Sequence, residues 1–140
     1  MKSHYRAVVI GGGVIGASTL YHLAKMGWND IVLVEKIEYT SGSTWHAAGL
    51  LPLFNMSYSV GKIHKYSVDL YQSLEAETGQ QVRFHKTGNL RLARNQERMD
   101  EYKRYCGTAS TIGVPFQMIG PAEIKKLWPF AKVDDLVGAL

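Results

Sequence analysis

Cysteine is almost absent from this chain of 140 residues, which contains Cys106 alone. A single cysteine excludes an intrachain disulfide and any metal site built from several cysteines, and we expect no metal site. No apolar run is long enough to span a membrane, so we expect no membrane association. Lysine and arginine form no dense run, so we expect no nucleic-acid partner. Internal repeats and low-complexity segments are missing as well.

The size and composition are those of one ordinary globular domain. Hydrophobic residues make up 46% and charged residues 20% of the chain, which argues against disorder. The net charge of +4 could favour an anionic cofactor, but a solvated surface is the better explanation because no dense Lys/Arg run occurs. The first strand is expected from residue 6, which leaves no room for a retained signal or transit peptide. We therefore expect a cytoplasmic protein with a prokaryotic-type N-terminus, unless a presequence has been removed.

The strongest signal lies near the N-terminus, where the apolar run Ala7–Ile10 meets a glycine cluster and then an apolar helical pattern. Gly11, Gly13 and Gly16 match the G-x-G-x-x-G pattern of dinucleotide-binding folds. In that pattern the first glycine permits a sharp turn, the second lets the backbone approach a pyrophosphate, and the third lets the helix pack against the strand. The N–H groups at the helix start are then free to face phosphate groups.

A carboxylate ends the second predicted strand. Residues 31–34 form an unbroken apolar run that we expect to be buried on both faces of a parallel sheet. Glu35 follows this run, 24 residues after Gly11. At this position of a βαβ unit a carboxylate accepts hydrogen bonds from the adenosine ribose and repels a 2′-phosphate. The alternative for Glu35 is a solvated residue at a strand end.

Local patterns predict further elements along the rest of the chain. In residues 39–49, small and hydroxyl side chains lead into a short helix over 42–49, which Gly49 can end. The remaining expected elements are helices over 62–78 and 95–112, a strand, turn and strand over 82–93, a short strand over 114–119, a short helix from Pro121, and the start of a strand over 135–140. Only two strands of a parallel sheet can be placed among these elements.

The fingerprint, Glu35 and the run Ser43–Gly49 together resemble one known family. They are similar to the N-terminal part of the dimethylglycine/sarcosine dehydrogenase group of D-amino-acid-oxidase-like flavoproteins. The resemblance covers essentially the whole chain and continues through Lys62–His64, Glu77–Gln80, Phe84–Gly88 and Leu90–Ala93.

The resemblance implies FAD as the cofactor, with its pyrophosphate on Gly11–Gly16 and its adenosine ribose on Glu35. It places Ser43 and Thr44 against the pyrophosphate or the flavin. In this family the histidine matching His46 can bond covalently to the flavin 8α-methyl group, and an ordinary histidine is the alternative. The residues expected to bind the cofactor are Gly11, Gly13, Val14, Ile15, Gly16, Glu35, Lys36, Gly42, Ser43, Thr44, His46, Ala48 and Gly49.

The implied fold class is α/β. It consists of an incomplete FAD-binding Rossmann-like (doubly wound) domain, followed by the start of an α+β substrate domain. We expect residues 1–55 to hold the FAD-binding βαβ unit and the second flavin-contacting helix. Residues 56–140 are expected to lead into the substrate domain. Because most strands of the parallel sheet are missing, we expect a fragment of a longer flavoprotein, or a chain that assembles with further protein segments.

The implied activity is that of an FAD-dependent amine dehydrogenase. Such an enzyme oxidises an N-methylated glycine, of the dimethylglycine or sarcosine type, by hydride transfer to the flavin. No catalytic acid or base can be named within this chain. The contacts with an electron acceptor, and with folate, are expected downstream. The alternatives are a non-catalytic flavin-binding fragment and an NAD-binding module, and the glycine- and hydroxyl-rich segment 42–49 disfavours the latter.

Overall fold

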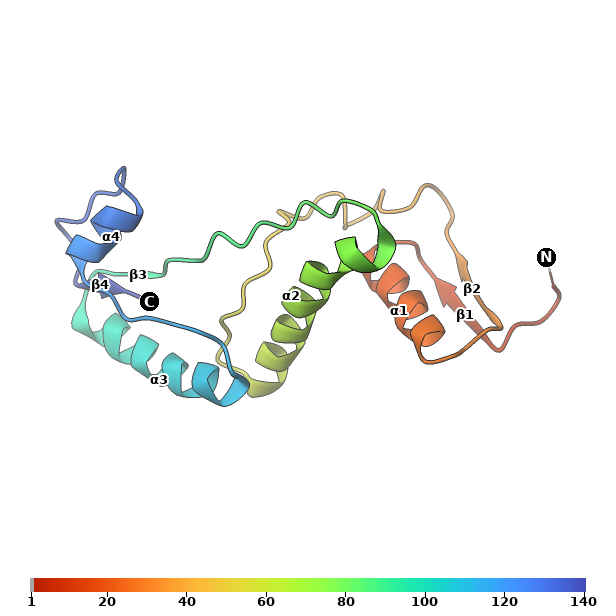
Figure 1. Cartoon of the computed structure of the whole chain (residues 1–140), viewed down its shortest axis with the longest axis horizontal. Helices are drawn as coiled ribbons and strands as arrows, with labels where there is room; N and C mark the ends of the chain where they lie inside the picture. The colour runs from red at the N-terminus through yellow and green to blue at the C-terminus, as the bar shows by residue number, and fades with distance from the viewer. Residues whose placement is uncertain (1) are drawn as a thin grey trace. The chain divides into compact units, whose positions relative to one another are not determined.

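The protein divides into two compact units in the computed structural model, which describes residues 2–140 (Figure 1). The first unit extends to Leu50, and the second comprises Leu51–Leu140. The first contains β1 (Ala7–Ile10), α1 (Val14–Lys25) and β2 (Ile31–Val34). The second contains α2 (Tyr58–Thr78), β3 (Leu92–Ala93), α3 (Gln96–Ile112), α4 (Pro121–Leu127) and β4 (Gly138–Ala139). Within residues 2–140, no helix is both long enough and apolar enough to cross a bilayer.

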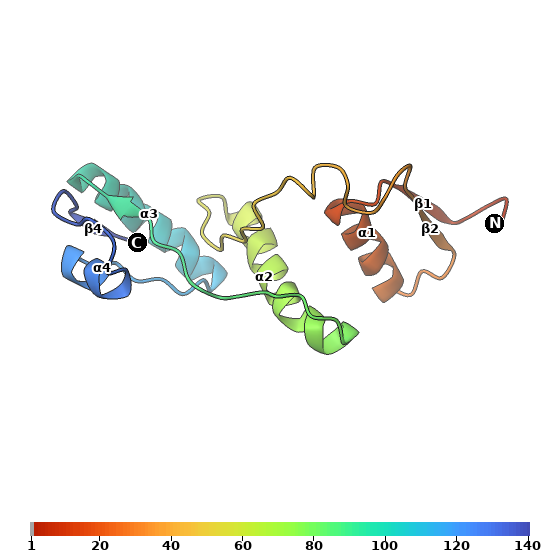
Figure 2. The same cartoon turned by 90° about the horizontal axis from the view of Figure 1, so that it is seen from above.

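The first unit is a βαβ element, as the glycine fingerprint predicts. Strands β1 and β2 are parallel, with Ala7 opposite Ile31 and Ile10 opposite Val34. Helix α1 lies beside the two strands (Figure 2). It packs on the face that carries Val9, because the position of a Cβ on Gly16 lies 3.5 Å from a methyl carbon of that side chain.

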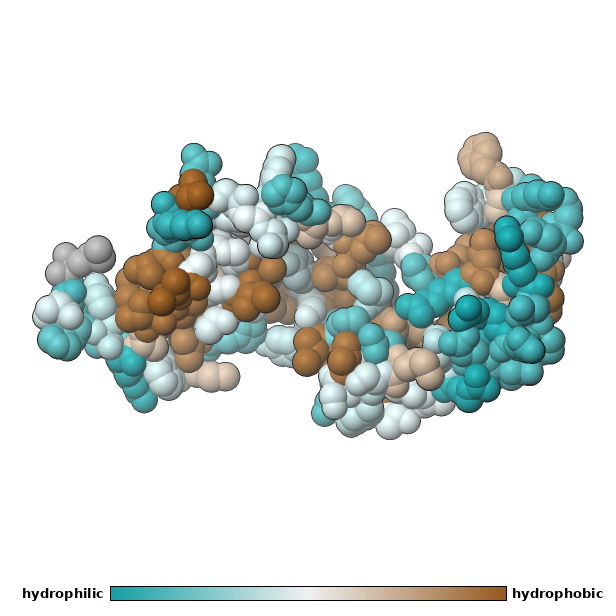
Figure 3. All heavy atoms as spheres, turned by 180° about the vertical axis from the view of Figure 1, so that it is seen from behind, coloured by the Kyte–Doolittle hydropathy of each residue, from teal (hydrophilic) through white to brown (hydrophobic). Residues whose placement is uncertain are grey.

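The other face of this two-stranded sheet is open within the unit. Val8, Ile10 and Val34 are 52%, 85% and 38% exposed, respectively. Figure 3 shows hydrophobic side chains gathered over these strands. The expectation that residues 31–34 are buried on both faces is therefore wrong for this unit. The reason is that a parallel sheet needs a covering layer on each side, and residues 2–50 supply only α1.

Helices α2 and α3 of the second unit begin and end where their capping residues stand. Ser57 accepts a hydrogen bond from the Val60 N–H, so α2 begins four residues earlier than the apolar pattern predicts. Asn95 caps α3 in the same way through the Arg98 N–H. The helices end at Gly79 and Gly113, both in the left-handed conformation that glycine adopts readily.

The predicted strand, turn and strand over 82–93 does not form. Figure 1 shows the chain between α2 and β3 as an extended trace without regular structure. Strand β3 pairs instead with β4, antiparallel, with Leu92 opposite Ala139. Arg83 has a φ of 54°, and this left-handed conformation interrupts the first of the two expected strands. The predicted strand over 114–119 is reduced to a single bridge between Ile119 and Ala139.

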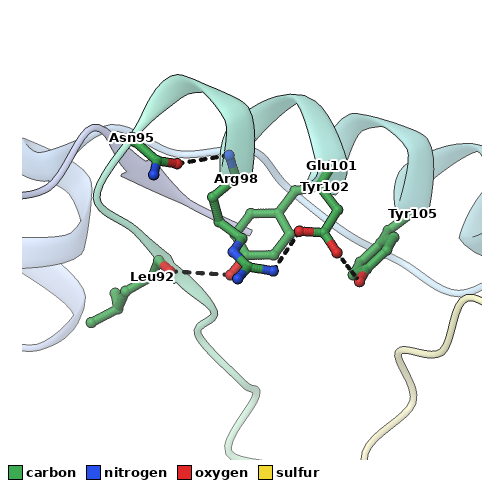
Figure 4. A network of polar contacts seen from close by, with 6 residues as sticks. All are labelled: Leu92, Asn95, Arg98, Glu101, Tyr102 and Tyr105. Carbon is green, nitrogen blue, oxygen red and sulfur yellow. Dashed lines mark hydrogen bonds and ion pairs between the residues drawn. The ribbon is translucent and has the colours of Figure 1, made fainter.

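A small core holds α3 and α4 against the β3–β4 pair. Tyr102 of α3 is 7% exposed, and its hydroxyl donates to the Leu92 carbonyl at 3.1 Å. On the same helix, Glu101 accepts a hydrogen bond of 2.5 Å from the Tyr105 hydroxyl and pairs with Arg98 (Figure 4). Ile124 of α4 is fully buried. Leu140 is 8% exposed and packs with Ala93 and Tyr102 in the same core.

Candidate cofactor-binding site

The glycine loop between β1 and α1 has a shape that only glycine permits at two positions. Gly11 has a φ of +107°, a conformation that residues with a side chain rarely adopt. Its N–H group donates to the Val34 carbonyl at 2.8 Å and so joins the loop to the end of β2. A Cβ on Gly16 would lie 1.8 Å from the Gly11 carbonyl oxygen. The first turn of α1 therefore passes directly over the loop.

Glu35 closes this loop from the end of β2. One carboxylate oxygen accepts a hydrogen bond from the Gly12 N–H at 2.6 Å. The other accepts from the N–H groups of Lys36 at 2.7 Å and Ile37 at 3.1 Å. These bonds lower the pKa of the Glu35 carboxyl below its ordinary value, with the largest effect from Gly12. The carboxylate is therefore charged at neutral pH and held beside the glycine loop.

Sequence reasoning missed the contribution of Gly12 and Tyr39 to this loop. Gly12 is buried, and a Cβ there would lie 2.5 Å from the Tyr39 ring. The fingerprint accepts any residue between its first two glycines, so a glycine at the middle position of Gly11–Gly13 was the only sequence signal for this contact. Gly12 gives the aromatic ring room to cover the loop.

Residues 39–46 form consecutive turns, and the predicted helix over 42–49 is wrong. The N–H groups of Trp45, His46 and Ala47 each donate to a carbonyl three residues earlier, at 3.2–3.3 Å. The Trp45 N–H also donates to the Thr40 carbonyl, five residues earlier, at 3.0 Å, which is not the hydrogen-bond pattern of an α-helix. Short hydroxyl side chains favour such turns, because they compete for the hydrogen bonds that a helix needs. The segment nevertheless lies where the prediction needs it, at the glycine loop.

Two hydrogen bonds hold this turn segment to the glycine loop. The Thr44 hydroxyl accepts from the Val14 N–H at 2.9 Å. The Thr40 N–H donates to the Gly12 carbonyl at 3.0 Å. The position of a Cβ on Gly13 lies only 3.0 Å from the Thr44 hydroxyl oxygen. The structure thus brings the two predicted halves of the site together.

His46 is exposed, and one of its ring nitrogens is engaged. Its Nδ1 lies 3.0 Å from the Gly42 carbonyl oxygen. A carbonyl can only accept, so a hydrogen bond at this distance requires the proton on Nδ1. In the neutral ring this tautomer leaves Nε2 with a free lone pair. The local geometry therefore presents Nε2 as the nucleophilic atom.

The other predicted binding residues differ in their exposure and in their hydrogen bonds to the site. Val14 and Ile15, in the first turn of α1, have side chains that are 46% and 80% exposed. Lys36 contributes its N–H group to Glu35, as described, while Ser43 supplies the carbonyl that accepts from the His46 N–H. Within residues 2–140, no hydrogen bond joins Ala48 or Gly49 to the glycine loop. The direct contacts of all these residues with a cofactor stay predictions.

The arrangement fits a dinucleotide that carries a pyrophosphate. Helix geometry leaves the N–H groups of Ile15 and Gly16 without acceptors inside α1. The missing side chains of Gly11 and Gly42 would meet nothing within 4 Å, so both positions leave open space. The first turn of α1 contains no acidic residue that would repel an anion. No group of three or more potential metal ligands occurs among residues 2–140.

The family model described as "DAO: FAD dependent oxidoreductase" matches residues 6–140. The chain belongs to this family. Membership implies FAD as the cofactor and sets aside the NAD-binding module considered above. It also confirms the α/β fold class with an FAD-binding Rossmann-like unit, which the parallel β1–β2 pair and α1 show directly.

Relatives match the chain over nearly all of its length. It is 45% identical to dimethylglycine dehydrogenase of Rattus norvegicus over 99% of the chain. It is 43% identical to sarcosine dehydrogenase of Homo sapiens, and 42% identical to the pyruvate dehydrogenase phosphatase regulatory subunit of Mus musculus, over 100% of the chain in both cases. The chain spans only 15–16% of the length of these three proteins.

Among solved structures, L-proline dehydrogenase from P. horikoshii is similar with a TM-score of 0.90 and 29% sequence identity. The match covers 99% of this chain and 36% of that one. The division of the chain after Leu50 lies near the boundary predicted at residue 55. The assignment of these units to a cofactor domain and a substrate domain stays a prediction.

Proposed function

We propose that this chain forms part of the FAD site of an amine dehydrogenase that oxidises an N-methylated glycine. The observation that carries the proposal is the joining of the glycine loop, Glu35 and the His46 turn into one site. Two of the similar proteins are named as dimethylglycine and sarcosine dehydrogenases, which supports a substrate of that type. FAD, when bound, accepts the hydride from the carbon next to the substrate nitrogen.

The chain's own contribution is to bind and orient the cofactor. The N–H groups of Ile15 and Gly16 would hold the pyrophosphate at the positive end of α1. Glu35 would hold the adenosine ribose, exchanging part of its present hydrogen bonding for bonds from the ribose hydroxyls. Because Glu35 is anionic, it would also discriminate against a 2′-phosphate.

His46 would tether the flavin through Nε2. In the tautomer that its bond to Gly42 requires, Nε2 carries the lone pair that forms the new nitrogen–carbon bond to the 8α-methyl carbon. Replacing a C–H bond of that methyl group by a C–N bond releases a proton and two electrons. The new bond would therefore require an oxidant, such as dioxygen, to take up the two electrons. The Gly42 carbonyl would then stabilise the ring by accepting from Nδ1–H throughout.

The remaining partners of this protein belong to the same proposal. The substrate carboxylate, an electron acceptor and folate would be bound by protein segments other than residues 1–140. Those segments would also cover the open face of the β1–β2 sheet, since Ile10 alone is 85% exposed. We place the protein in the cytoplasm, with neither membrane nor nucleic-acid partners.

The experiment compares the purified full-length protein with its His46→Asn variant. We expect a flavin absorbance spectrum that bleaches when dimethylglycine or sarcosine is added without an acceptor. After acid precipitation, flavin should stay with the wild-type polypeptide and be released from His46→Asn. Release of all flavin from the wild type would refute the tether. Failure of any N-methyl amine to bleach bound flavin would refute the proposed reaction.

A non-catalytic flavin-binding protein is the second candidate. The similarity to a protein named as a phosphatase regulatory subunit favours it, because the identity of 42% is almost the same as that to the dehydrogenases. The bleaching experiment separates the two candidates. Bound flavin that no amine reduces, but that chemical reductants bleach, would favour the second.

A further inference from the structure

We propose that Thr44 is a positioning residue whose hydroxyl joins the turn that carries His46 to the start of α1. Its loss would remove one of the two hydrogen bonds that hold the turn segment with His46 to the glycine loop and α1. This inference rests on the proposed function in one respect, because it concerns the placement of His46 relative to the bound flavin. It adds a role for a side chain that the resemblance places only near the cofactor.

Helix α1 has no cap of its own. Its N-cap residue is Gly13, which has no side chain to accept from the first N–H groups. The Thr44 hydroxyl does this instead for Val14, from 30 residues further along the chain. Gly13 makes this approach possible, since a Cβ at that position would lie 3.0 Å from the hydroxyl oxygen. A helix start is thus capped by the segment that the cofactor must also contact.

The Thr44 hydroxyl can accept one hydrogen bond and donate another at the same time. After accepting from the Val14 N–H it still carries one hydrogen to donate. A phosphate at the start of α1 can accept that hydrogen, so Thr44 is able to bind the helix and an anion at once. Serine can do the same, whereas valine has the shape of threonine but neither donates nor accepts. The two substitutions therefore separate the hydroxyl from the bulk of the side chain.

The position of His46 depends on Thr44 through the turn between them. The His46 N–H donates to the Ser43 carbonyl, and its Nδ1 bonds to Gly42. The Ala47 N–H donates to the Thr44 carbonyl at 3.3 Å. These hydrogen bonds connect residues 42–47 to one another. The Thr44 side chain connects this turn to α1. The second bond to the loop comes from the Thr40 N–H, and the Thr40 carbonyl accepts from the Trp45 N–H of this turn at 3.0 Å. Thr44 therefore supplies the bond to α1, and Thr40 supplies the bond to Gly12.

The test compares Thr44→Val, Thr44→Ser and Ser41→Ala in the full chain. Ser41→Ala is a matched control, because it removes one hydroxyl of the same turn segment, whose bond of 2.8 Å goes to the Glu38 carbonyl and not to α1. Three quantities are measured: hydrogen exchange at the Val14 amide without flavin, the dissociation constant of FAD for each variant in a His46→Asn background, and the rate at which flavin becomes resistant to acid release.

For Thr44→Val we expect at least fivefold faster exchange at Val14, at least fivefold weaker FAD binding, and at least tenfold slower tethering, since one or more hydrogen bonds are lost. Thr44→Ser and Ser41→Ala should stay within twofold of the wild type. Unchanged exchange and binding in Thr44→Val would overturn the proposal, and so would an equal loss in Thr44→Ser or Ser41→Ala. If wild-type flavin is fully released by acid, the tether is refuted, while exchange and binding still decide the role of Thr44.

Discussion

Replacement of Gly16 by alanine tests whether the glycine loop has the tight geometry described above. The added Cβ would lie 1.8 Å from the Gly11 carbonyl oxygen, whereas real Cβ atoms almost never approach a neighbour within 3.0 Å. The helix and the loop must therefore separate by about 1.2 Å. The obstacle is a backbone atom of a turn that also bonds to β2, so no side-chain rotation relieves the clash.

The magnitude follows from two opposing effects. Alanine is favoured over glycine inside a helix by about 1 kcal/mol. Inserting a methyl group where there is no room costs about 1–3 kcal/mol, and a backbone obstacle places Gly16→Ala at the upper end. The net destabilisation of the first unit is then about 2 kcal/mol, or roughly a 30-fold increase in its open fraction.

The assay is hydrogen exchange along α1 in the full chain, combined with titration of FAD. We expect α1 amides to exchange roughly 30-fold faster in Gly16→Ala. FAD should bind at least tenfold more weakly, because the displaced N–H groups no longer converge on the pyrophosphate. Gly107→Ala is the matched control: it lies within α3, and its Cβ would meet nothing within 4 Å. It should stabilise α3 by about 0.5–1 kcal/mol and leave α1 unchanged.

The reasoning would be refuted if Gly16→Ala protected the α1 amides as well as the wild type does and bound FAD with unchanged affinity. That result would mean that the loop accommodates a side chain at no cost. The fingerprint would then describe the sequence but not a steric requirement.

Three further predictions concern single side chains. The bond from Gly12 favours the charged form of Glu35, so the Glu35 carboxylate stabilises the folded glycine loop. This stabilisation should be fully present above pH 4.5 and be lost as the pH falls through the lower pKa of Glu35 in the folded state. Hydrogen exchange of the glycine loop measured against pH should show this loss, and Glu35→Gln should abolish the dependence. Tyr102→Phe should destabilise the second unit by about 1 kcal/mol in urea unfolding, since it leaves the Leu92 carbonyl without its partner; an unchanged midpoint would contradict this. Ile124→Ala should cost about 2–5 kcal/mol in the same measurement because Ile124 is fully buried, whereas Leu127→Ala, at 67% exposure, should cost much less. Equal losses at the two positions would contradict the burial seen in α4.

The sequence by itself determined the elements whose signals are local. The βαβ unit follows from the glycine spacing between two apolar runs, and the helix over residues 96–112 from an apolar periodicity that ends at glycine. The family, and with it FAD, could be recognised from the same fingerprint and the run Ser43–Gly49, since few folds require those residues in that order. The acidic residue after β2 was likewise visible as part of the site.

Tertiary structure alone decided the contacts between distant segments. The pairing of Leu92 with Ala139 joins residues that no local pattern relates, and it replaced the hairpin that alternation predicts. His46 lies in consecutive turns and not in a helix. The Thr40 N–H bond to Gly12, which no local pattern predicts, holds this turn segment at the glycine loop. The hydrogen bond from Val14 to Thr44 could not be predicted from local sequence either. It joins residues 30 positions apart and uses the space that Gly13 leaves for the Thr44 hydroxyl. Sequence patterns report the preferences of neighbouring residues, whereas the folded chain satisfies each polar group with whichever partner it brings within reach.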